Sequence, residues 1–129
     1  MDALRNFAWL AGRVFIAALF IYDATVLVRF PAGSVEYMER FGVPGFMFWP
    51  TAAFQFIGGL MIVAGLATRL IALGFVGFCL LTALTFHRNL ADLTELIHFG
   101  KDFGLAGGFL FLVAGGAGAW SLDRRWRLD

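Results

Sequence analysis

The amino-acid sequence predicts an all-α integral membrane protein, a four-helix bundle with short amphipathic helices in the loops on its outer side. Residues 46–86 contain a single charged side chain, Arg69, which divides them into two apolar arms. Each arm is long enough to cross a bilayer, and neither carries the polar stripe of a soluble amphipathic helix. The chain is 60 % hydrophobic and 15 % charged, with a mean hydropathy of +0.81. This composition excludes an ordinary soluble domain.

The length of 129 residues suits one domain, 1–129, with spans at about residues 7–28, 46–66, 70–86 and 103–120. With a net charge of +1, the chain lacks the excess positive charge that is typical of nucleic-acid-binding proteins. The single cysteine, Cys79, excludes an intramolecular disulfide and a cysteine-based metal cluster.

The first span carries two charges, Arg13 and Asp23. They lie about 15 Å apart along a helix axis, so they cannot pair directly. Arg13 is close enough to a membrane surface to extend its guanidinium into the headgroups. The shorter side chain of an aspartate reaches the headgroups less easily than that of an arginine. We therefore expect Asp23 to face a polar bundle interior or a cation from another segment.

The loop of residues 29–45 has Pro and Gly residues at both ends. Between them, Ser34 is a candidate cap for a short helix whose apolar face is Val35, Met38 and Phe41. Such a helix lies at the membrane surface or covers the mouth of the bundle as a lid.

The second span has Gln55 as its only strong hydrogen-bonding side chain, and the third ends at His87. Leucines and acidic residues in 89–102 predict another short amphipathic turn before the fourth span. The fourth span is rich in glycine, and Gly104 with Gly108 forms a small-xxx-small step. Such a step lets helices pack closely, within one chain or between chains.

Loop charges predict the topology. The side with both termini holds six cations and three carboxylates, a net charge of +3: Arg5, Arg13, Arg69, Arg124, Arg125, Arg127, Asp2, Asp123 and Asp129. The other side holds four cations and six carboxylates, a net charge of −2: Arg29, Arg40, Arg88, Lys101, Asp23, Glu36, Glu39, Asp92, Glu95 and Asp102. The positive-inside rule then places both termini in the cytoplasm.

Many polar side chains fall within about a turn of the outer membrane face: Asp23, Arg29, His87, Arg88, Glu95, His98, Lys101 and Asp102. A histidine, carboxylates and cations beside an aromatic wall suit an amphipathic ring compound such as a quinone. The alternative is a rim of paired charges that only closes the bundle. Haem held by His87 and His98 is less favoured, and we predict no metal site.

The chain resembles the DoxX-like family of small four-span bacterial membrane proteins. The resemblance covers most of the chain and rests on the order and spacing of several short motifs: Gly12-Arg13, Met38 to Pro44, Gly58 to Leu60, Gly65 to Arg69, His87, His98 to Asp102, Gly107-Gly108 and Trp120 to Asp123. The chain departs from the family where Gln55 replaces a frequent glutamate. It also has Asp23 and Arg29 where the family often has Gly and Lys.

The resemblance implies a bacterial inner-membrane protein related to quinone-linked oxidoreductases, including thiosulfate:quinone oxidoreductase. We expect the quinone head near Asp23, Gln55, His87 and Lys101. His87 would exchange protons, and Lys101 or Arg13 would stabilise the reduced oxygen. The predicted catalytic residues are therefore His87, Asp23 and Lys101, and the predicted ligand-binding residues are Arg13, Gln55, His98 and Asp102.

Other relatives of this kind act as membrane chaperones or accessory subunits. A non-catalytic accessory or assembly subunit of a larger membrane complex is therefore the alternative hypothesis, and the sequence leaves open whether the chain is an enzyme. Under both hypotheses the partners are the lipid bilayer and other membrane subunits or further copies of the chain.

Overall fold

The computed structural model describes residues 2–86 and 91–127. It confirms the all-α membrane architecture, with four helices that are long and apolar enough to span a bilayer and no strand among the described residues. The elements are α1 (Asp2–Arg29), α2 (Pro31–Arg40), the 3-10 helix η1 (Gly45–Met47), α3 (Phe48–Ala64), α4 (Thr68–Phe86), α5 (Leu93–Gly115) and α6 (Leu122–Arg125).

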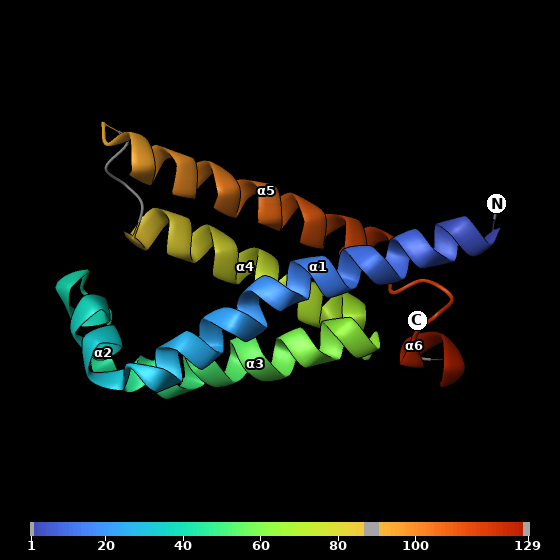
Figure 1. Ribbon diagram of the computed structural model, residues 1–129, viewed down its shortest axis with the longest axis horizontal. Coiled ribbons are helices and arrows are strands. Elements are labelled where there is room, and N and C mark those ends of the chain that lie inside the picture. Colours follow the sequence, from blue (N-terminus) through green and yellow to red (C-terminus); the bar gives the residue numbers. More distant parts are fainter. Residues whose placement is uncertain (1, 87–90, 128–129) are drawn as a thin grey trace.

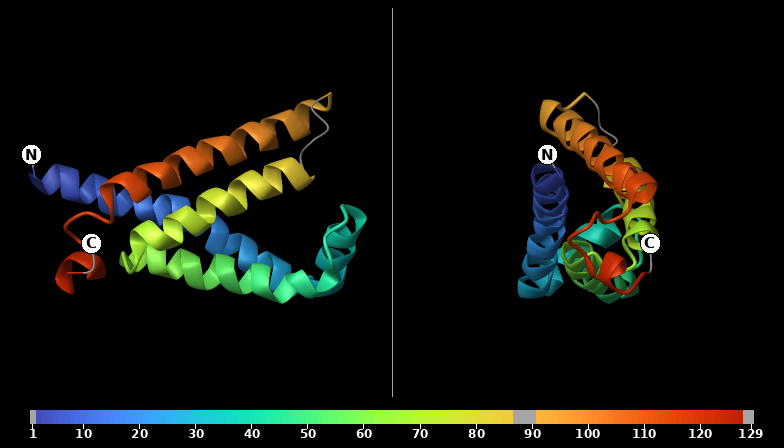
Figure 2. Two further views of the ribbon diagram at one scale, coloured as in Figure 1. Left: turned by 180° about the vertical axis from the view of Figure 1, so that it is seen from behind. Right: turned by 90° about the vertical axis from the view of Figure 1, so that its right-hand side faces the viewer.

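The four long helices form two antiparallel pairs that cross each other. α1 packs against α3, and α4 packs against α5 (Figure 1). The two pairs lie close together near the crossing and separate toward the end of the bundle that carries α2 (Figure 2). We call this the α2 end, and the opposite end, where both chain termini lie, the termini end. The helix pairs are therefore farther apart at the α2 end than at the crossing.

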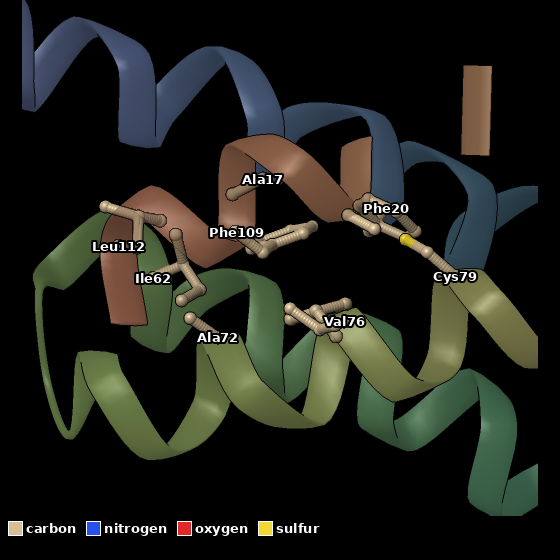
Figure 3. Packing of buried hydrophobic residues seen from close by; sticks show 10 residues of the cluster. Ala17, Phe20, Ile62, Ala72, Val76, Cys79, Phe109 and Leu112 are labelled. Atoms are coloured by element: carbon tan, nitrogen blue, oxygen red, sulfur yellow. The ribbon is translucent and has the colours of Figure 1, made fainter. Parts of the chain in front are cut away.

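Phe75 of α4 lies at the centre of the crossing and is fully buried. Its ring stacks on Phe109 of α5, with centroids 4.7 Å apart and planes 9° apart. It also contacts Phe20 of α1 at 4.9 Å and Phe54 of α3 at 4.6 Å. Each long helix therefore contributes one ring to a common aromatic cluster, within the core shown in Figure 3.

A buried guanidinium closes the termini end. Arg13 is 1 % exposed, and its two terminal nitrogens donate to the carbonyl oxygens of Ala117 at 3.0 Å and Trp120 at 2.7 Å. These carbonyls belong to the segment that follows α5. Arg13 therefore does not extend toward the headgroups, because the protein itself supplies acceptors inside the bundle.

The same segment also caps α4. The Asp123 carboxylate accepts hydrogen bonds from the backbone N–H groups of Ala67 at 2.6 Å and Thr68 at 2.8 Å. These are donors that the first turn of a helix leaves unpaired. The backbone N–H of Asp123 donates to the Gly65 carbonyl at 2.8 Å. Asp123 thus joins the α3–α4 turn to the C-terminal segment, beside Arg13.

Gly65 is required at this junction for two reasons. Its φ is +75°, a left-handed conformation that residues with a side chain rarely adopt. A Cβ atom at this position would also collide with the guanidinium of Arg13 and with Ser121.

The fourth spanning helix differs most from its predicted bounds. It begins at Leu93 rather than Phe103, because Asp92 caps it by accepting from the Thr94 N–H at 2.9 Å. The amphipathic turn expected in 89–102 is therefore, where described, the start of α5. The helix ends at Gly115, and the chain then takes positive φ angles at Gly116 and Gly118.

The short helix expected in the first long loop is present as α2. It begins at Pro31 rather than at a Ser34 cap, because proline is suited to the first helical position. The Ser34 hydroxyl lies within the helix and donates to the Phe30 carbonyl at 2.8 Å. α2 covers the space between the helix pairs, as the lid interpretation predicted (Figure 1).

We predict that Arg13→Met lowers the free energy of unfolding by about 2–4 kcal/mol, because the carbonyls of Ala117 and Trp120 lose their hydrogen-bond donors and the Asp123 carboxylate loses a nearby positive charge. Thermal unfolding in detergent, followed by circular dichroism, measures the change. Arg5→Met, an exposed arginine on the same helix, is the matched control and should leave the transition unchanged. Equal transitions for the two variants would show that the Arg13 contacts do not hold the bundle.

Candidate functional site

A cavity of about 590 Å³ occupies the α2 end of the bundle, between the two helix pairs. Aromatic and aliphatic side chains form most of its wall, and several polar groups converge on it. The lining residues are Leu19, Phe20, Asp23, Leu27, Phe30, Gly33, Ser34, Tyr37, Met38, Thr51, Gln55, Phe78, Thr82, Phe86, His98, Asp102 and Leu105. Both the volume and the mixture of groups are typical of a small-molecule pocket.

Four of the residues that the sequence singled out line this cavity together. Asp23 of α1 and Gln55 of α3 belong to one helix pair, and His98 and Asp102 of α5 belong to the other. The polar groups therefore face the cavity from two walls. A ligand with polar atoms at both ends of a flat apolar body would match this distribution.

Asp23 and Gln55 act as a pair across the α1–α3 contact. The Gln55 amide lies close enough to the Asp23 carboxyl group to interact with it. Gln55 is only 2 % exposed, and its Oε1 has no hydrogen-bond partner in the part of the chain that the structure describes. Asp23, in contrast, is exposed at the cavity. Gln55 therefore orients the carboxyl group, and Asp23 offers it to the cavity.

His98 and Asp102 lie four residues apart on α5, so they share one face of the helix. This relation depends on the early start of α5. Had the helix begun at Phe103, both residues would have been in a loop, with no fixed spacing. The His98 imidazole adds a side chain that can donate and accept hydrogen bonds on this wall.

An aromatic cluster ties α2 to the end of α4 and closes one side of the cavity. Tyr37 stacks on Phe86, with centroids 5.3 Å apart and planes 13° apart. Phe41 contacts both rings, at 5.0 Å from Tyr37 and 5.1 Å from Phe86. Because this is a contact between rings rather than a covalent link, α2 can separate from α4 at modest cost.

Burial raises the pKa of the Tyr37 phenol above its ordinary value, and the negative charge of Glu95 acts in the same direction. The positive charge of Arg40 acts against them. Tyr37 therefore keeps its proton throughout the neutral range and offers the cavity a hydroxyl donor.

Three predicted site residues are not seen at the cavity. Arg13 lies at the termini end, where its hydrogen bonds are to Ala117 and Trp120. Lys101 is exposed on α5 and is not among the lining residues. His87 lies outside the described residues. Arg29, part of the predicted outer cluster, lies near Tyr22, 6.0 Å from its ring centroid.

Sequence reasoning missed Tyr37, Thr51 and Thr82 as lining residues. Thr82 was not predicted to line a cavity, because a hydroxyl inside an apolar span usually forms a hydrogen bond with a carbonyl of its own helix. Here it donates to the carbonyls of Phe78 and Cys79 at 3.0 Å. Tyr37 could have been found from the sequence, since Ser34, Tyr37 and Met38 share a face of α2.

Comparisons with known proteins agree with this architecture. Residues 8–88 match the DoxX family. The chain is 41 % identical to "Inner membrane protein YqjF" of Escherichia coli, over 96 % of this chain and 95 % of that protein. It is 33 % identical to "Inner membrane protein YphA" of the same organism, over 97 % of this chain and all of that protein. It is 30 % identical over about half its length (49 %) to "Putative oxidoreductase CatD" of Bacillus subtilis, covering 47 % of that protein. No solved structure gives a significant match.

We predict that the cavity admits a small polar reagent. In a Cys79→Ala background, Thr51→Cys should react with a small maleimide at least about tenfold faster than Ile62→Cys, because Ile62 is fully buried and reacts only after local opening. Mass spectrometry of the detergent-solubilised protein gives both rates. Similar rates at the two positions would mean that the cavity is closed to reagents or that the crossing is loosely packed.

Proposed function

The chain belongs to the DoxX family, and from this premise we propose that it is a quinone-associated subunit of a membrane oxidoreductase, with the quinone head in the cavity at the α2 end. The observation that carries the proposal is this cavity, which combines aromatic walls with Asp23, Gln55 and His98 inside a set of spanning helices. The names of two relatives support an inner-membrane location, and that of a partial relative supports redox chemistry.

A quinone head fits the character of the cavity. Its flat ring suits the aromatic side chains Phe20, Phe78 and Phe86, and its two oxygens require polar partners. Such partners face the cavity from both helix pairs. The isoprenoid tail remains in the bilayer, so we propose that the quinone enters sideways between the helix pairs.

The residues on the cavity support binding and proton transfer. Tyr37 and Gln55 carry donors for a quinone oxygen, while Asp23 carries an acceptor for the hydroxyl of the reduced form. We assign the proton-exchanging role to His98, the histidine that the structure describes at the cavity. We propose that the electrons come from a partner subunit.

We propose that both termini lie in the cytoplasm. The predicted topology gives the side with both termini a net charge of +3 and the opposite side −2, which is the asymmetry that the positive-inside rule relates to orientation. The cavity would then lie near the outer surface of the inner membrane.

A second candidate function is a non-catalytic accessory subunit, and one observation favours it. Gly100, Gly104 and Gly107 lie along one side of α5, and a Cβ atom built on any of them would meet no atom within 4 Å. Glycines that no other described helix approaches leave room for a helix of another subunit. In this case the cavity would have no redox role.

We predict that the purified protein in lipid nanodiscs binds a short-chain ubiquinone or menaquinone analogue, and that Gln55→Leu weakens binding about tenfold. The substitution keeps the side-chain size but removes the amide, so the polar contact is lost. Equilibrium dialysis measures the affinity. Asp23→Asn, which removes the charge of the carboxylate but keeps the shape of the side chain, should also change the affinity for the analogue.

Arg5→Gln, at the termini end, is the control and should bind as the unchanged protein does. Binding that is insensitive to both cavity variants would contradict the assigned site. If neither analogue binds and Gly104→Leu disrupts a larger complex in native mass spectrometry, the accessory function is favoured instead.

A further inference from the structure

A second hollow lies on the other face of α2. It is a groove of about 790 Å³ between α2 and the start of α3, lined by Pro31, Ala32, Val35, Glu36, Glu39, Arg40, Phe48 and Trp49. It shares no lining residue with the cavity at the α2 end. α2 therefore separates two distinct hollows, and the groove has no part in the proposed quinone site.

We expect the groove to lie at the depth of the lipid headgroups. α2 begins directly after α1 ends at Arg29, and α3 begins at Phe48, so both walls lie where spanning helices leave the apolar core. Trp49 is 63 % exposed and forms part of the wall. Exposed tryptophan at the end of a spanning helix is typical of the interfacial region.

The charges of the groove are mixed, with two carboxylates and one guanidinium. Glu36 and Arg40 form an ion pair at 3.5 Å, and both side chains are largely exposed. Glu39 lies about one turn after Glu36 on the same side of α2 and also lines the groove. Its Oε1 would be 3.4 Å from a Cβ atom at Gly45, so the close approach of η1 limits where this carboxylate can lie.

We propose that this groove binds a phospholipid whose headgroup is zwitterionic and ends in a primary ammonium group, as in phosphatidylethanolamine. Glu36 and Glu39 accept hydrogen bonds from the ammonium group, and Arg40 binds the phosphate. Trp49 packs its indole face against the ammonium group. Pro31 and Val35 contact the glycerol and the first carbons of the acyl chains.

Charge complementarity selects this headgroup over the other common ones. An anionic glycerol headgroup offers no cation to the two carboxylates and is repelled by their net charge. A choline headgroup is cationic but has no N–H donor for them, and only one exposed aromatic ring lines the groove. A primary ammonium group carries a positive charge and also supplies N–H donors to the two carboxylates.

The test is native mass spectrometry of the delipidated protein titrated with phosphatidylethanolamine, phosphatidylcholine and phosphatidylglycerol of identical acyl chains. We expect phosphatidylethanolamine to bind about tenfold more tightly than the other two. In the double variant Glu36→Gln/Glu39→Gln, the affinity should fall to that for phosphatidylcholine. Asp2→Asn, a carboxylate substitution at the termini end, should keep the preference.

Unfolding transitions of all variants are compared first, to show that each variant is folded. Trp49→Leu is a second variant that leaves both carboxylates intact, and it should weaken the binding of phosphatidylethanolamine. Equal affinity for the three lipids, or a preference that survives the double variant, would overturn the proposal. Because the groove and the cavity share no residue, quinone binding can fail while this preference is present, and the reverse also holds.

Discussion

One buried guanidinium determines how this bundle is closed. A charged side chain inside a membrane-spanning helix is costly unless protein groups replace its water, and Arg13 finds two carbonyl oxygens in the segment after α5. Those carbonyls are available because α5 stops at Gly115 and the chain turns back across the termini end. The same segment brings in Asp123, which caps α4. Helices α1 and α4 and the connection after α5 are thereby joined at one place.

The closed termini end and the aromatic crossing together place the cavity between the helix pairs at the α2 end. Phe75 receives a ring from each of the other three long helices, which fixes the point where the two pairs cross. Beyond that point the pairs separate, and α2 covers the space between them. Polar groups from two walls meet there inside otherwise apolar helices, which is why we interpret the cavity as a binding site for an amphipathic ring. The groove on the outer face of α2 would hold lipid at the same end.

The sequence predicted the parts of this fold that depend on long apolar runs. The single charge at Arg69 located the hairpin of α3 and α4, and polar residues near the outer face included Asp23, His98 and Asp102, which do line one cavity. The role of Arg13 could not be predicted, because its acceptors are backbone carbonyls of a segment distant in the sequence. The start of α5 was missed because a helix that continues past the bilayer has an amphipathic first part. That pattern resembles a separate surface helix, although the Asp92 cap was present in the sequence.

Photolabelling with an azido-quinone in lipid nanodiscs, followed by peptide mapping of the labelled residues, is the most direct test of the cavity as a quinone site. We expect label on the cavity-facing parts of α1, α3 and α5, around Asp23, Gln55 and His98, and competition by unlabelled quinone. Residues around Arg13 should stay unlabelled. Label confined to lipid-facing side chains, or label that excess quinone does not displace, would contradict the assignment of the cavity as a quinone site.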